Sequence, residues 1–215
     1  IALDREFGVW DMLTNTASWD SGHVKTLTSG TRWNGGMTSD PIVDLQEMLG
    51  KSLQQVTDVY FNQETAIAFM MHPSTQAFIK LFNGEQRVEG TLKDVGDAQR
   101  RGTVDFQIVG LPFTFHVCAA KGLRDATAAE PDFILGGDVV GTSRLETLTD
   151  EETITTTTTF RRKLPAGVGY TTREFRIENR GPHGGVMVVA AMADRAVMRS
   201  KKVGFLIKGA VQAGS

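Results

Sequence analysis

The chain of 215 residues is 40% hydrophobic and 22% charged, which is ordinary for a globular protein with a substantial buried core. Its formal net charge of −2, from 23 basic and 25 acidic side chains, argues against a dedicated nucleic-acid-binding protein, because neutralising phosphates requires a basic excess. The single cysteine, Cys118, excludes an intrachain disulfide and a cysteine-based zinc site, and no apolar run is long enough to cross a bilayer.

The first predicted element is an amphipathic helix over residues 2–15. Its apolar side chains recur at helical spacing and leave the charged residues on the other side. These apolar residues are Leu3, Phe7, Trp10 and Leu13. Because the chain opens inside this pattern, we expect the helix to continue from upstream residues that are missing here. Residues 14–40 are rich in Ser, Thr, Gly and Asn, and they predict a long loop anchored by Trp19, Leu27 and Trp33.

The second predicted helix begins at Asp40 and Pro41. Asp40 is a favourable N-cap, and Pro41 at the first helical position loses no hydrogen bond. One apolar stripe is expected to face the core, formed by Ile42, Leu45, Leu49 and Leu53. The "NGG" turn at 34–36 lacks the order of a phosphate-binding loop, so we interpret it as a turn beside an anchoring Trp33.

The remaining pattern predicts helices first and strands after. Residues 56–62 predict a strand, and residues 63–82 predict two short helices separated at His72–Pro73, because proline disfavours the helical conformation of the residue before it. Further strands are predicted in a region rich in aromatic and β-branched residues, at 103–119, 133–141, 153–162, 169–179, 184–198 and 203–211. Polar connections are expected at 83–102 and 120–132. This order predicts an α+β fold.

His116 and Cys118 are the strongest candidates for catalysis. They lie two residues apart in a predicted strand and therefore point to the same face. A nucleophilic pair needs a hydrogen bond between the two side chains and a third orienting group, and no Asn or Asp nearby in the sequence is well placed. We interpret them as a buried cysteine and a hydrogen-bonded histidine. A small cytosolic Cys/His hydrolase remains as the alternative from a different class.

Other polar clusters do not form a site. We expect turns and solvated charges at 100–101, 150–152, 161–163, 181–185 and 199–202. The sequence therefore predicts no catalytic, cofactor-binding or metal-binding set of residues. The structural anchors that we expect instead are Trp10, Trp19, Trp33, Asp40, Pro41 and Pro73.

Four stretches, taken in order, carry a family resemblance. They are "LDREFGVWDMLTNTASW", "SDPIVDLQEML", "DVYFNQETAIAFMMHPSTQAFIKLF" and "VMVVAAMADRAVMRSKKVGFLIKGAV". They resemble, respectively, the end of the spine helix, the following helix, the axial-domain strand with its helices, and the closing strands of the major capsid protein of tailed bacteriophages, which has the Hong Kong 97-type fold.

The resemblance implies a peripheral domain, with a long spine helix and strands, and an axial domain, with a mixed sheet flanked by helices. Residues 1–55 would form the spine-helix end, the loop and the following helix. Residues 56–180 would be mainly axial domain with β-rich insertions, and residues 181–215 would be closing strands that return to the peripheral domain. The family's N-terminal arm and extended loop are not found in this chain, so no crosslinking residue is carried over.

The implied function is that of a structural subunit without enzymatic activity or cofactor. Such subunits assemble into pentamers and hexamers that enclose double-stranded DNA in an icosahedral head, so the expected location is the virion capsid, assembled in the host cytoplasm. The expected partners are further copies of the chain and portal, scaffold or decoration proteins, with weak, non-specific DNA contacts and no membrane. An encapsulin-type compartment shell, which shares the fold, is the nearest alternative.

Overall fold

The chain divides into two units, which are described separately. The first comprises Ile1–Thr156 and Met198–Ser215, and the second comprises Thr157–Val197. The computed structural model describes residues 10–35, 38–83, 103–119, 121–122, 132–143, 156–161, 171–177, 185–191 and 194–212.

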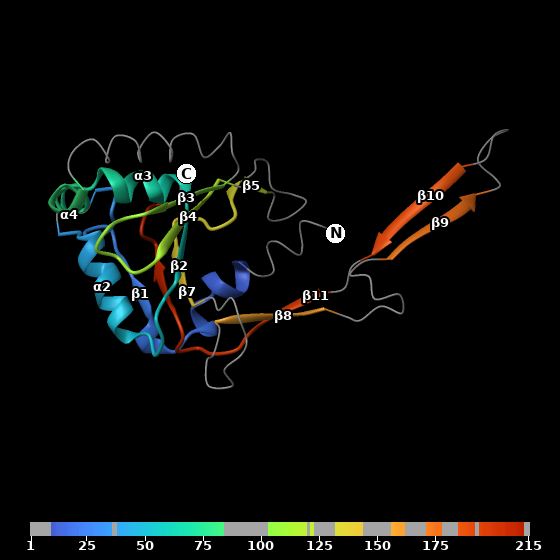
Figure 1. Cartoon of the computed structure of the whole chain (residues 1–215), viewed down its shortest axis with the longest axis horizontal. Helices are drawn as coiled ribbons and strands as arrows, with labels where there is room; N and C mark the ends of the chain where they lie inside the picture. The colour runs from blue at the N-terminus through green and yellow to red at the C-terminus, as the bar shows by residue number, and fades with distance from the viewer. Residues whose placement is uncertain are drawn as a thin grey trace. The chain divides into compact units, whose positions relative to one another are not determined.

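In its described residues, the first unit is built on a six-stranded mixed sheet with the order β1-β12-β7-β2-β4-β3 (Figure 1). The strands are β1 (Val24–Thr26), β2 (Asp58–Asn62), β3 (Thr103–Gln107), β4 (Thr114–Cys118), β7 (Val139–Thr142) and β12 (Phe205–Lys208). Strand β2 pairs in parallel with β4 and antiparallel with β7. Strand β12 lies between β1 and β7, so segments from the two ends of the sequence share one sheet.

One face of this sheet forms the main core. Because side chains alternate along a strand, every second residue of β2 and β4 points to this face. Val59 and Phe61 of β2 and Phe115 and Val117 of β4 are fully buried there. The rings of Phe61 and Phe115 stack with their centroids 5.5 Å apart, which gives the aromatic contacts that strand neighbours favour.

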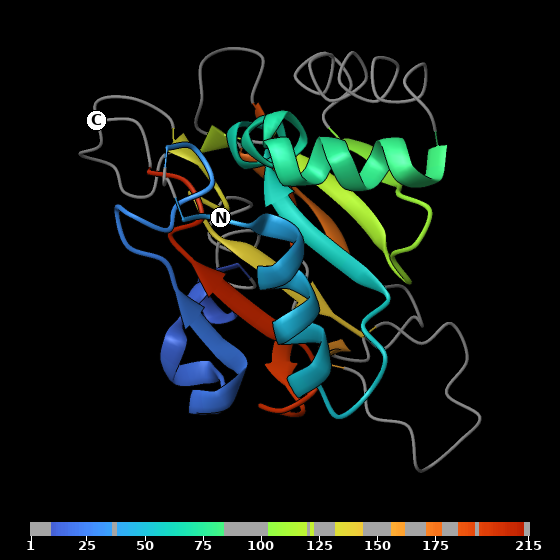
Figure 2. The ribbon, with the colours of Figure 1, turned by 90° about the vertical axis from the view of Figure 1, so that its left-hand side faces the viewer.

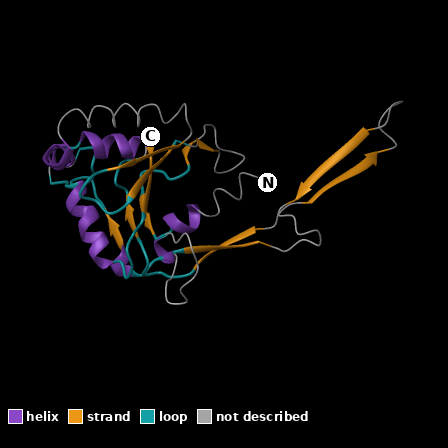
Figure 3. Ribbon diagram, viewed as in Figure 1, coloured by secondary structure: helices purple, strands orange, loops and turns teal. Residues whose placement is uncertain are grey.

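Three helices cover this apolar face, as Figure 2 shows: α2 (Pro41–Lys51), α3 (Gln63–Met71) and α4 (Pro73–Asn83). Their side chains join the strands in one hydrophobic cluster, which includes Leu45, Met48, Phe69, Met70 and Ile79. Figure 3 shows the helices as a layer against the strands. The arrangement is the α+β layering in which helices shield one face of a sheet.

Local capping sets where these helices begin and end. An Asp40 carboxylate oxygen accepts hydrogen bonds from the backbone N–H groups of Ile42 and Val43, at 3.1 and 3.2 Å. The side chain of Asn62 caps α3 in the same way, since it accepts from Thr65 N at 2.7 Å. His72 then has an extended backbone (ψ 134), which ends α3 before Pro73 starts α4.

The opposite face of the sheet is covered only in part by described residues. Leu13 and Trp19 pack there against Val140 and Leu206 in a second, smaller cluster. The indole N–H of Trp19 donates to the Leu13 carbonyl at 2.8 Å, which holds the turn between them. Two short 3₁₀ helices, η1 (Thr16–Ser18) and η2 (Ser21–His23), connect this turn to β1.

The second unit consists, in its described residues, of paired strands. Strand β9 (Thr171–Ile177) pairs antiparallel with β10 (Gly185–Ala191) along its whole length. Strand β8 (Thr157–Arg161) pairs with β11 (Asp194–Met198). In the first unit, β5 (Lys121–Gly122) and β6 (Asp132–Phe133) form a further two-stranded sheet.

The α+β prediction, the helix start at Asp40–Pro41 and the break at His72–Pro73 are confirmed. The stripe predicted for the second helix is wrong at its end. The helix stops at Lys51, so Leu53 lies beyond it and is 70% exposed, while Met48 takes the buried position.

Two strand predictions are also wrong in extent. Residues 184–198 form β10 and β11, two strands with different partners, and not one run. Within 133–141, a turn at 134–137 separates β6 from β7. Of the first predicted helix, residues 10–14 are helical, and residues 2–9 lie outside the described part of the chain. Residues 84–102 and 123–131, which belong to the predicted polar connections, also lie outside it. Within the described ranges, no helix has the length and apolar character of a membrane span.

Gly141 offers a test of the packing between β7 and β12. A Cβ atom built at Gly141 would lie 2.6 Å from Cζ of the fully buried Phe205, which is its direct partner in the sheet. We expect Gly141→Ala to lower the free energy of unfolding by about 1–3 kcal/mol, the usual cost of overpacking. Urea denaturation of the purified chain measures this change.

Gly50→Ala is the matched control for Gly141→Ala. A Cβ atom at Gly50, within α2, meets nothing within 4 Å. Because alanine is a better helix former than glycine, this variant is expected to be more stable than the wild type by about 0.5–1 kcal/mol. Equal midpoints for Gly141→Ala and the wild type would contradict the packing described here.

Candidate functional site

A polar cluster lies on the second face of the sheet, centred on His116 of β4. The strand register places Tyr60 of β2 on one side of His116 and Asp105 of β3 on the other. His116 Nε2 lies 2.7 Å from Asp58 Oδ1, and Nδ1 lies 2.7 Å from Asp105 Oδ1. The Tyr60 ring stacks on the imidazole with centroids 4.7 Å apart. Three neighbouring strands are thus joined through one side chain.

The two aspartates of this cluster differ in exposure. The Asp58 side chain is 11% exposed and also accepts from the Thr57 hydroxyl at 2.5 Å, whereas Asp105 is 60% exposed. Because a buried polar group needs its hydrogen-bond partners, the partly buried Asp58 depends on the contact with His116, and Asp105 depends on it much less.

The same geometry argues against the Cys/His hydrolase. His116 has both nitrogens in contact with carboxylates, so neither is left to activate Cys118. Burial, with a smaller contribution from the charge of Asp105, raises the pKa of the Cys118 thiol to about 11. The thiol is therefore protonated at neutral pH, which is the opposite of a nucleophilic cysteine. The sequence analysis finds no well-placed Asn or Asp close to His116 in the sequence, and strand pairing brings Asp58 and Asp105 to it from two other strands.

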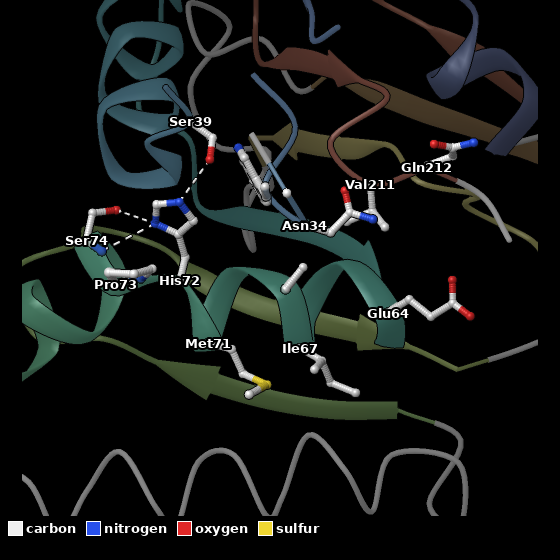
Figure 4. Close-up of a pocket in the computed structure, with 13 residues that line it drawn as sticks. Asn34, Ser39, Glu64, Ile67, Met71, His72, Pro73, Ser74, Val211 and Gln212 are labelled. Carbon is white, nitrogen blue, oxygen red and sulfur yellow. Dashed lines mark hydrogen bonds between the residues drawn. The ribbon is translucent and has the colours of Figure 1, made fainter. Parts of the chain in front are cut away.

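The first unit also has an open pocket of about 980 Å³ where α3 meets α4, shown in Figure 4. The α3 residues that line it, Glu64, Ile67, Ala68 and Met71, recur at helical spacing and so share one side of that helix. Trp33 and Val211 line the pocket from other segments. We call this cavity the α3–α4 pocket.

His72 organises the end of the α3–α4 pocket at which α3 stops. Its Nε2 lies 2.9 Å from the Ser39 hydroxyl oxygen, and its Nδ1 lies 2.8 Å from that of Ser74 (Figure 4). These contacts tie Ser39, two residues before α2, to the junction of α3 and α4. The pocket therefore has an apolar wall on α3 and a hydrogen-bonded wall at His72, the mixture that is typical of binding surfaces.

Trp33 connects this pocket to the core. The side chain is 3% exposed, and its indole N–H donates to Asp44 Oδ2 of α2 at 2.8 Å. The other oxygen of Asp44 pairs with Lys25 Nζ at 2.8 Å. Trp33 also packs against Phe69 of α3, with ring centroids 5.7 Å apart. The sequence pattern suggests a large anchor at Trp33 but does not reveal these partners.

The other predicted anchor residues lie at separate places in the first unit. Trp10 contacts Tyr60 with ring centroids 5.3 Å apart, and Trp19 belongs to the second cluster. Asp40 caps α2, Pro41 is its first residue, and Pro73 begins α4 and lines the α3–α4 pocket. The structure thus brings Trp33 and Pro73 together at the pocket and Trp10 and Trp19 together at the second cluster, and the anchoring role of the whole set stays a prediction.

Within the described ranges, no three His, Cys, Asp or Glu residues are placed to hold a metal ion. The clusters predicted at 100–101, 150–152 and 181–184 lie outside these ranges. Residues 199–202 are described, and Arg199, Lys201 and Lys202 are exposed there. The described residues therefore present a polar cluster and a pocket, without an assembled catalytic set.

His116 allows a test of the polar cluster. His116→Ala is expected to lower the free energy of unfolding by about 1–3 kcal/mol, because the mostly buried Asp58 loses its hydrogen-bond partner. Asp105→Asn removes an exposed charge and is expected to cost less than about 1 kcal/mol. Chemical denaturation at pH 6 compares the two variants. Equal losses for both would contradict the dependence of Asp58 on His116.

Glu47 gives a prediction for pH. Hydrogen bonds from Lys25, then from Lys51, lower the pKa of Glu47 from 4.5 to about 2. A lowered pKa in the folded state stabilises the protein above the unfolded value, and this contribution disappears as the pH falls from 4.5 towards 2. Since the side chain is 44% exposed, Glu47→Gln is expected to cost less than about 1 kcal/mol at pH 7, and nothing near pH 2. A constant difference across a pH series of denaturation curves would contradict this.

No known protein family and no curated protein matches the chain by sequence. Solved structures do match. A phage-related protein of Bordetella bronchiseptica RB50 is similar with a TM-score of 0.68 and 15% identity, over 97% of this chain and 63% of that chain. A prophage protein of Escherichia coli CFT073, assigned as a capsid protein, is similar with a TM-score of 0.59 and 11% identity, over 88% of this chain and 53% of that chain.

The SrpI encapsulin of Synechococcus elongatus PCC 7942 matches with a TM-score of 0.49 and 12% identity, over 98% of this chain and 64% of that chain. The chain spans less than two thirds of the length of each of these three proteins. At such low identity the two stronger similarities concern the fold. The chain therefore has a capsid-like fold.

Proposed function

We propose that this chain is the structural subunit of a phage head with the Hong Kong 97-type fold, assembling into pentamers and hexamers around double-stranded DNA. The observation that carries the proposal is the capsid-like fold, which extends over 97% and 88% of the chain in the two strongest similarities. Since a fold alone does not imply a function, the surfaces and side chains of this chain must also be compatible with it.

Two features of the described residues support a structural role. Met71, 62% exposed, lies with Ile67 at an open pocket, which makes an apolar patch of the kind found at protein–protein interfaces. The strongest catalytic candidate, Cys118, has a protonated thiol and no free histidine beside it. A subunit that gains stability by contacts with its neighbours needs an exposed apolar patch, and it does not need a catalytic site.

The domain assignment of this proposal follows the resemblance. Residues 1–55 form the transition from the peripheral to the axial domain, residues 56–180 are mainly axial, and residues 181–215 return to the peripheral domain. Trp10, Trp19, Trp33, Asp40, Pro41 and Pro73 act as anchors of the folded subunit. Portal, scaffold and decoration proteins are the proposed further partners, and DNA is contacted weakly, in keeping with the net charge of −2.

Negative-stain electron microscopy of the purified chain tests this function. We expect closed shells, or the five- and six-membered rings from which they are built, with nuclease-protected DNA in particles isolated from cells. Shells that contain protein cargo without DNA would favour a compartment shell over a phage head. A chain that sediments only as a monomer at every concentration would overturn the proposal.

A further inference from the structure

A projecting leucine lies at the far end of α2 from the α3–α4 pocket. Leu53, 70% exposed, follows the last residue of α2 by two positions. Its backbone N–H donates to the Lys202 carbonyl at 3.1 Å, and the neighbouring Ser52 hydroxyl accepts from Gly204 N at 2.9 Å. These two bonds fix the backbone around Leu53 against the segment that contains Lys202 and Gly204. We call Leu53, with the flanking Lys51 and Lys202, the Leu53 knob.

The Leu53 knob is basic at its edge. The side chains of Lys51 and Lys202 are 42% and 57% exposed, and Lys201 and Arg199 are exposed nearby in the sequence. The acidic side chains paired with them are Glu47 and Asp20, so the described cations outnumber the anions. An isolated exposed leucine needs no explanation, but this one is fixed by a backbone hydrogen bond to Lys202 and lies two residues from Lys51, so it combines an apolar contact with a basic edge.

The α3–α4 pocket has the complementary character. Its apolar wall is formed by Ile67, Ala68 and Met71, and Glu64 is the only acidic or basic residue, histidine aside, among the described residues that line it. Its volume of about 980 Å³ admits more than one side chain. An apolar knob with a basic edge therefore matches an apolar pocket with an acidic edge.

These two surfaces cannot meet within one copy. Ser39, which lines the pocket, precedes α2, and Leu53 follows it. The helix of 11 residues separates them by about 16 Å at 1.5 Å per residue. A contact between two different patches on identical subunits is heterologous, and it generates a ring when the rotation closes.

We infer that the Leu53 knob of one copy docks into the α3–α4 pocket of the next copy. This inference rests on the proposed function, for which it names the surfaces that join neighbouring subunits. In the docked state, Leu53 lies against Met71 and Ile67, and the lysines of the knob face Glu64. The contact repeats from copy to copy in one direction.

Cysteine pairs test the contact directly. Leu53→Cys and Met71→Cys, prepared separately and mixed under mild oxidation, are expected to give a crosslinked dimer, because the docked side chains are adjacent. Val109→Cys replaces Met71→Cys in the control, since Val109 is 51% exposed and lies outside both surfaces. Cys118 is common to all samples. A crosslink no stronger for the Leu53–Met71 pair than for the control overturns the inference.

Association measurements test its energetic role. Leu53→Glu is expected to weaken self-association at least tenfold in sedimentation velocity, while Val43→Glu, at an exposed position on α2 outside both surfaces, leaves it unchanged. Glu64→Lys and Lys202→Glu should each weaken association, and the double variant should restore it in part. Normal association of Leu53→Glu overturns the inference.

The two proposals fail in different ways. Shells formed normally by Leu53→Glu would keep the capsid function and overturn this contact. Crosslinked open chains that form neither rings nor shells would keep the contact and overturn the capsid function. A wild-type chain that remains monomeric, together with no crosslink between Leu53→Cys and Met71→Cys, would overturn both. Thermal melting of each variant confirms that the substitutions, all at exposed positions, leave the fold intact.

Discussion

The alternation of side chains along β2 is the constraint on which the first unit depends. Val59 and Phe61 point to one face and are fully buried, while Asp58 and Tyr60 point to the other. A shift of one residue in the pairing with β4 would place Asp58 in the apolar core and lose the contact with His116. The register is therefore specified from both faces, by apolar packing on one and by a charged cluster on the other.

The packing on the two faces of the sheet also determines which surfaces stay exposed for contacts with other molecules. Helices α2, α3 and α4 bury the apolar face, so the outward side of α3 and both ends of α2 remain available for contacts. The Trp33–Asp44 hydrogen bond joins the loop before α2 to the helix itself. Because Asp44 also pairs with Lys25 of β1, the loop, the helix and the sheet edge are held as one body. A pocket with such support keeps its shape, which preorganises it for binding.

Local features were predictable from the sequence, and long-range ones were not. Asp40 and Pro41 define a helix start through bonds within three residues, so their pattern suffices. Leu53 was misassigned because the apolar spacing continues after the helix has ended at Lys51. The charges near His116 come from strands 58 and 11 residues away, and only sheet pairing brings them together. Their one signal in the sequence is a single aspartate in each of two strands that also carry buried apolar residues, Asp58 in β2 and Asp105 in β3.

The described part of the first unit combines a well-packed core with large apolar side chains that stay exposed. A monomeric protein would gain by burying Leu53 and Met71, yet both remain exposed while Phe61, Phe69 and Phe113, which contact Phe115, are buried. The backbone at Leu53 is held by hydrogen bonds, so its exposure does not come from a loose segment. Leaving a fixed apolar side chain in water has a free-energy cost that association with another copy removes. Exposed, fixed side chains such as Leu53 are therefore the observations on which the proposed contact between copies rests.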